Sequence, residues 1–127
     1  MEIQMVAAGA AEVPVVRHEV AAHLTSLSVY SDVVDTAALL VSELLANAIT
    51  HGQPPVRCAA TVTTVDDSSV VRIEVWDGSP EPPILRDQVL DSESGRGLHL
   101  VEKLSSRWGW SATETGKCTW CELDTVR

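Results

Sequence analysis

Three short groups of polar residues and glycines have types and spacings that could bind a ligand. In the first, Glu43 and Asn47 are four residues apart in a segment with helical periodicity, so they are neighbours on one surface of the expected helix. An asparagine amide oxygen can bind a hard metal ion, and a nearby glutamate can orient or deprotonate an attacking group. Taken alone, a solvated helix face would explain the same two residues.

The second group, Asp77 and Gly78, lies where an expected strand ends and a long irregular stretch begins. A carboxylate at a strand end could accept a hydrogen bond from the amino group of a base, and the glycine would let a flat ligand approach the backbone. Asp-Gly is also a common turn dipeptide, and a turn is the simpler explanation of the pair by itself.

The third group, Gly95-Arg96-Gly97, precedes a segment with helical periodicity. Backbone N–H groups at the start of a helix form an anion site, and Arg96 could add a charge-assisted contact to a phosphate. The alternatives are a flexible entry to the helix and an arginine that pairs with a nearby carboxylate.

Hydrophobic periodicity predicts the elements that must position these groups. Apolar residues recur every three to four positions in the helical segments and every second position in the strands. We expect helices over residues 13–27 and 31–52 and from about Gly97, and strands over residues 3–8, 56–65 and 71–76, from about Trp108, and over 117–123. This order predicts an α+β fold with helices on one face of a mostly antiparallel sheet.

The stretch from Gly78 to about Ser94 contains three prolines and several charges. A structureless connection of this length is uncommon in a compact domain and usually forms a functional lid or a disordered segment. We expect it to be disordered when no ligand is bound.

The composition favours one domain over residues 1–127. Hydrophobic residues make up 45% and charged residues 21% of the chain, which is typical of globular proteins. The formal net charge of -9 disfavours direct binding to nucleic acid or to an anionic membrane surface. No apolar run approaches the roughly 18 residues that a membrane span requires.

Three cysteines and no recognisable export signal indicate reduced thiols in the cytoplasm. Cys118 and Cys121 have the spacing of half a zinc or redox motif. Residues three apart in a strand point to opposite faces, so we expect buried structural cysteines instead.

In their order along the chain, the three groups resemble the motifs of the GHKL superfamily of ATPases and kinases. The stretches that carry the resemblance are residues 41–52, 75–80, 95–101 and 116–123. Within that superfamily, the chain is most similar to the small anti-sigma-factor serine/threonine kinases and their stand-alone actinobacterial relatives. The resemblance extends from about residue 12 to residue 124.

This resemblance implies a Bergerat fold, in which a mixed sheet carries helices on one face and ATP lies between the helices and a lid at about residues 78–96. By position, Asn47 would coordinate a Mg²⁺ ion that bridges the ATP phosphates. Glu43 would be the general base or orient it. Asp77 would bind the adenine amino group, directly and through water.

The remaining site residues follow from the same resemblance. Gly95, Gly97 and Leu98 would cradle the phosphates at the start of the third helix. Cys118 stands where many members have a threonine near the water of the adenine site. A thiol is a weaker hydrogen-bonding group than a hydroxyl, so we expect reduced nucleotide affinity.

The function implied is an ATP-dependent serine/threonine protein kinase that binds a sigma factor and phosphorylates an anti-anti-sigma partner. The resemblance also suggests a homodimer. The alternative is a nucleotide-sensing regulatory module that binds ATP without phosphotransfer. A complete sensor histidine kinase is disfavoured, because no dimerising helical hairpin with a phosphoacceptor histidine precedes the domain.

Overall fold

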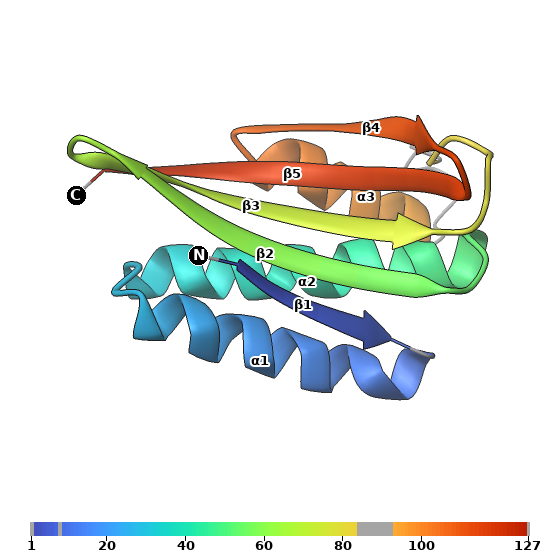
Figure 1. Ribbon diagram of the computed structural model, residues 1–127, viewed down its shortest axis with the longest axis horizontal. Coiled ribbons are helices and arrows are strands. Elements are labelled where there is room, and N and C mark those ends of the chain that lie inside the picture. Colours follow the sequence, from blue (N-terminus) through green and yellow to red (C-terminus); the bar gives the residue numbers. More distant parts are fainter. Residues whose placement is uncertain (1, 8, 84–92, 127) are drawn as a thin grey trace.

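A sheet and a layer of helices make up the fold (Figure 1). The computed structural model describes residues 2–7, 9–83 and 93–126. The sheet has five strands in the order β1-β2-β3-β5-β4, and each neighbouring pair is antiparallel. The elements are β1 (Glu2–Ala7), a 3-10 turn (Ala10–Glu12), α1 (Val13–Ser26), α2 (Ser31–His51), β2 (Val56–Val65), β3 (Ser68–Asp77), α3 (Glu93–Leu104), β4 (Arg107–Thr113) and β5 (Gly116–Val126).

The predicted α+β two-layer class is confirmed, and the elements lie close to their expected positions. The sheet was expected to be mixed, whereas the strand pairs described are all antiparallel. The third helix was expected near Gly97 but begins at Glu93. Glycine is a poor helix former, so the periodicity could not indicate that the helix runs through Gly95 and Gly97.

The long helix α2 is the centre of the helical layer, with α1 and α3 packed on either side of it and the sheet against its inner face. By length and composition alone it could cross a membrane. Eight of its residues are instead buried within the fold, which identifies α2 as the core helix of the domain: Val34, Ala37, Leu40, Val41, Leu44, Leu45, Asn47 and Ala48.

Burial alternates along β3, so every second side chain faces the helices. Val71, Ile73 and Val75 form the apolar part of that face. The same alternation places Asp77 on the helix-facing side at the end of the strand, where its carboxylate is buried. Lys117 on β5 lies directly opposite Asp77 in the strand register. The apolar inner face therefore ends in a buried charged pair.

Candidate functional site

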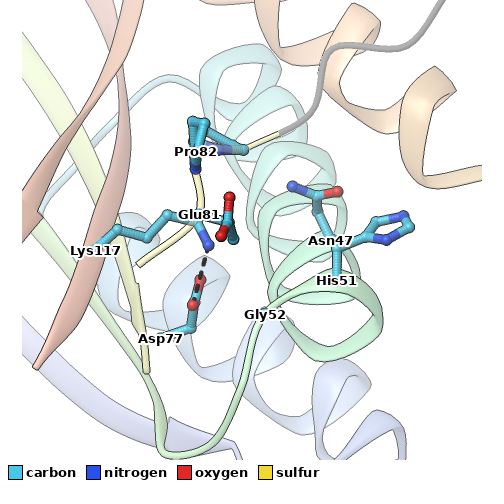
Figure 2. Close-up of a pocket in the computed structure, with 8 residues that line it drawn as sticks. Asn47, His51, Gly52, Asp77, Glu81, Pro82 and Lys117 are labelled. Atoms are coloured by element: carbon cyan, nitrogen blue, oxygen red, sulfur yellow. Dashed lines mark hydrogen bonds and ion pairs between the residues drawn. The ribbon is translucent and has the colours of Figure 1, made fainter. Parts of the chain in front are cut away.

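A cavity of about 240 Å³ lies between the C-terminal end of α2 and the ends of β3 and β5. Figure 2 shows Asp77 and Lys117 on one side of it and Asn47 on the helix on the other. The residues that line it are Asn47, His51, Gly52, Asp77, Glu81, Pro82, Pro83 and Lys117. The structure thus brings together two of the predicted site residues, Asn47 and Asp77, which are distant in sequence.

Asp77 is held in place by hydrogen bonds to one of its two carboxylate oxygens. Its Oδ1 accepts from the backbone N–H of Ser79 at 2.8 Å and from Lys117 Nζ at 3.1 Å. The Asp77 side chain is 2% exposed and the Lys117 side chain 5% exposed. A buried charge is stable only when it is paired and hydrogen-bonded, and Lys117 supplies that pairing. The carboxylate is therefore a fixed acceptor at the wall of the cavity.

Gly52, immediately after α2, allows the helix end to approach Asp77. A Cβ atom on Gly52 would lie 2.5 Å from both Asp77 Cγ and the carbonyl oxygen of Ala48. Gly52 is the last residue of the helix predicted over residues 31–52. Its backbone is extended there, with φ near -89°, so close packing rather than a left-handed conformation requires glycine.

Asn47 has a buried amide whose oxygen has no partner among the residues that the structure describes. The residue is 5% exposed, and within the described part of the chain its Oδ1 accepts no hydrogen bond. Such an orphaned oxygen is costly unless a ligand satisfies it. An amide oxygen is a ligand that Mg²⁺ accepts, and Mg²⁺ usually keeps several waters and substrate oxygens. The site therefore fits the predicted ion, with Asn47 as its protein donor.

No group of three or more His, Cys, Asp or Glu side chains that could hold a metal occurs among the residues the structure describes. A cation at Asn47 would consequently depend on oxygen atoms of a bound ligand and of water for most of its coordination. This is the arrangement expected for a metal ion that arrives with a polyphosphate.

Glu43 lies one helical turn before Asn47 on α2 and is half-buried. It is not one of the residues that line the cavity described above. Its predicted role as general base, or as the group that orients one, stays a prediction.

Gly78 has a different contact from the one expected. Its N–H donates to the carbonyl oxygen of Gln53 at 2.6 Å, and a Cβ atom on it would lie 2.7 Å from the carbonyl oxygen of Pro54. The space next to Gly78 is thus occupied by the chain that follows α2. The glycine holds that segment against the end of β3, and it does not line the cavity that contains Asn47 and Lys117.

The phosphate-binding residues predicted at the third helix lie in the first turns of α3. The backbone of Gly95, Arg96, Gly97 and Leu98 is helical. The side chains at this end of α3 lie outside the described residues, so the contact of Arg96 with a phosphate stays a prediction. Within the predicted lid, residues 84–92 also lie outside the described residues.

The prediction that Cys118 belongs to the nucleotide site is wrong, because its side chain lies on the other face of the sheet. Cys118 lies opposite Trp76 in the register, whereas Lys117 lies opposite Asp77, so the thiol is on the sheet face away from the helices. Its Sγ is 4.0 Å from Glu74 Oε2 on that outer face. Thr119 lies opposite Val75 and faces the helices instead, because side chains alternate along a strand. Burial, followed by the charge of Glu74, raises the pKa of Cys118 to about 11.

The sequence-based prediction missed Lys117 and His51 as residues of the cavity. His51 lies in the last turn of α2, where a histidine commonly interacts with the terminal carbonyl groups of a helix. The alternation of side chains along the last strand could have indicated which residues of that strand share a face with Lys117. It could not place Lys117 in the cavity, because that requires the strand register, which puts Lys117 opposite Asp77. Gly116 precedes it, and a Cβ atom there would overlap the carbonyl oxygen of Asp77. The two strand ends are therefore packed in direct contact.

Comparison with known families agrees with this geometry. The model of the histidine kinase-like ATPase domain matches residues 6–123, which include Glu43, Asn47, Asp77 and Lys117. No curated protein matches the chain. The matched region spans nearly the whole fold, and the cavity is lined by the buried Asp77 and by Asn47, whose amide oxygen accepts no hydrogen bond from the described residues. The chain therefore belongs to the histidine kinase-like ATPase domain family, which is of the GHKL type.

Proposed function

We propose that this protein is an ATP-dependent serine/threonine protein kinase of the anti-sigma type. It binds a sigma factor and transfers a phosphoryl group to a hydroxyl of an anti-anti-sigma partner in the cytoplasm. Family membership supports ATP binding, and the finer assignment rests on the order of the motifs. One observation carries the proposal: Asp77, with a buried carboxylate, and Asn47, whose buried amide oxygen has no partner among the described residues, line the same cavity.

The described residues have separate roles in binding the nucleotide. Asp77 accepts a hydrogen bond from the amino group of adenine, while Ser79 and Lys117 fix its carboxylate. Asn47 would hold Mg²⁺ through its amide oxygen. When bound, the ion supplies positive charge to the phosphates, which the acidic chain does not.

Phosphoryl transfer also needs a group that positions the incoming hydroxyl. Glu43 lies one turn from Asn47 on the same rigid helix, so it would stay at a constant distance from the phosphate end of the nucleotide. A carboxylate there would accept the proton of the serine or threonine hydroxyl, or orient that hydroxyl for attack.

Calorimetry with Mg-ATP tests the binding part of the proposal. Titration of the unaltered protein should give saturable binding, and Asp77→Asn should weaken it by about tenfold or more, because it replaces the charged acceptor of the amino group. Circular dichroism verifies that the variant is folded. Unchanged affinity in a folded Asp77→Asn protein would show that the adenine assignment is wrong.

A nucleotide-sensing module without phosphotransfer is the second candidate, favoured by one observation. Glu43 does not line the cavity that contains Asn47 and Asp77. Incubation with labelled ATP and candidate partner proteins separates the two functions. The kinase is supported if the partner becomes labelled, if Glu43→Ala abolishes the labelling, and if Glu19→Ala does not. Glu19 is exposed on α1, so Glu19→Ala is the control. Tight ATP binding with no labelled product supports the sensor.

A further inference from the structure

Lys117 is an unusual residue for the position it occupies. Lysine is almost never fully buried unless it is paired, and the Lys117 side chain is only 5% exposed. Figure 2 shows it reaching from β5 along the cavity wall to Asp77, with a dashed line between the two groups. It lies in the cavity that the proposed function assigns to ATP, and its role there so far is to fix the Asp77 carboxylate.

The ion pair leaves one acceptor and further donors for a ligand. Both hydrogen bonds described for the Asp77 carboxylate end on Oδ1, so Oδ2 is the oxygen left to accept another. An ammonium group has three donors, and one of those on Lys117 is directed at Asp77. The wall of the cavity therefore presents an acceptor directly beside a donor.

A nucleotide base cannot replace Lys117 as the partner of Asp77. The base is neutral, and a buried carboxylate without a counterion is strongly unfavourable. The lysine must consequently stay beside Asp77 when the base binds. Its remaining donors then need an acceptor on the ligand, because buried donors without partners are costly.

We propose that Lys117 and Asp77 together recognise the adenine base through hydrogen bonds. Asp77 Oδ2 accepts from the exocyclic amino group of adenine, and Lys117 Nζ donates to the ring nitrogen N1 beside it. This inference rests on the proposed ATP binding and deepens it, since it makes Lys117 a specificity-determining residue. Guanine in the same pose would place its O6 against the carboxylate and its N1–H against the ammonium, so both contacts would be repulsive.

The test compares Mg-ATP with its 1-deaza analogue, which keeps the amino group but has C–H in place of N1. On the unaltered protein, the analogue should bind about tenfold to 100-fold more weakly, as expected for one lost hydrogen bond to a charged group. The Lys117→Met substitution should weaken ATP binding, and the variant protein should bind ATP and the 1-deaza analogue with nearly equal affinity. Lys103→Met, at an exposed position on α3, is the matched control and should keep the discrimination.

Each outcome decides a separate point. Equal affinity of the two nucleotides for the unaltered protein overturns the role of Lys117 and leaves ATP binding intact. Discrimination that persists in Lys117→Met also overturns it, because another group would then read N1. Binding of neither nucleotide by the unaltered protein overturns the ATP assignment and this inference with it. The comparison on the unaltered protein needs no variant, so it stands even if Lys117→Met does not fold.

Discussion

Both faces of the sheet carry polar side chains, but the partners and the burial of these side chains differ between the two faces. On the outer face, the Arg72 guanidinium lies 4.4 Å from the ring centre of Trp120 and donates to Glu122 at 2.8 Å. Arg107 Nε donates to the other oxygen of Glu122 at 2.6 Å, and its guanidinium also pairs with Asp124. These charges are partly exposed, and Arg72, Arg107 and Glu122 each have at least two partners.

At the end of the inner face, the polar groups are fewer and more deeply buried. The Asp77–Lys117 pair is almost inaccessible to solvent, and Asn47 has an amide oxygen without a partner among the described residues. Exposed ion pairs contribute little to stability, whereas buried and incompletely satisfied groups are expensive to keep. The contrast indicates that the outer face is a structural surface and that the inner end is built for a ligand.

The largest effect should follow from breaking the inner pair. Asp77→Asn leaves the Lys117 ammonium buried without a counterion, which should lower the free energy of unfolding by about 3–5 kcal/mol. Urea denaturation measures the loss. The double variant Asp77→Asn/Lys117→Met removes both charges and should recover most of the stability. A stable single variant would mean that the pair is more hydrated than its burial indicates.

A smaller effect should follow from filling the space at Gly52. In Gly52→Ala the new methyl group overlaps Asp77 Cγ and the Ala48 carbonyl, so the helix end or the carboxylate must move. Overpacking of this kind typically costs about 1–3 kcal/mol, and ATP binding should weaken with it. Thermal unfolding and calorimetry measure the two effects.

Gly9→Ala is the matched control for that variant, because no atom of the described residues, apart from those of its chain neighbours, lies within 4 Å of the position of its Cβ. It should leave both properties unchanged. An equal loss in the two variants would show that the close contact of Gly52 with Asp77 is not the cause.

On the outer face, the effect should be smaller still and dependent on pH. Hydrogen bonds from Arg107 and then Arg72 lower the pKa of Glu122 below its ordinary value of 4.5. A carboxyl with a lowered pKa in the folded state stabilises the protein fully above its unfolded pKa. That contribution is lost as the pH falls through the folded pKa. Glu122→Gln should therefore cost at most about 1 kcal/mol at neutral pH.

Urea denaturation above and below pH 4.5 checks this prediction. The difference in stability between the unaltered protein and Glu122→Gln should shrink as the protein is acidified. A difference that stays constant would show that packing against the arginines, rather than charge, determines the role of Glu122.

The smallest effect concerns Cys118. Because its thiol lies on the outer face, Cys118→Ala should change the affinity for Mg-ATP by less than about twofold, as expected for a site without shared partners. Calorimetry on this variant also tests the correction made above. A large loss of affinity for Mg-ATP would show that Cys118 does belong to the nucleotide site.

Much of the fold could be predicted because it depends on local patterns. The period of three to four in α2 and the period of two in β3 gave their types correctly. The bounds of α2 were predicted to within one residue, whereas β3 begins three residues before the predicted 71–76 and ends one residue after it. The start of α3 could not be predicted, because the two glycines in its first turns hide its periodicity. The roles of Asn47 and Asp77 came from the order of the motifs, and the structure places both in one cavity.

By itself, the sequence determined the residue types available to the site and the elements that carry them, since both depend on short stretches of chain. Only the tertiary structure decided which of those residues meet. The register of β3 with β5 places Lys117 beside Asp77 and turns Cys118 away, and a shift of one residue would reverse the two. Strand register depends on packing between distant segments, which local periodicity does not specify.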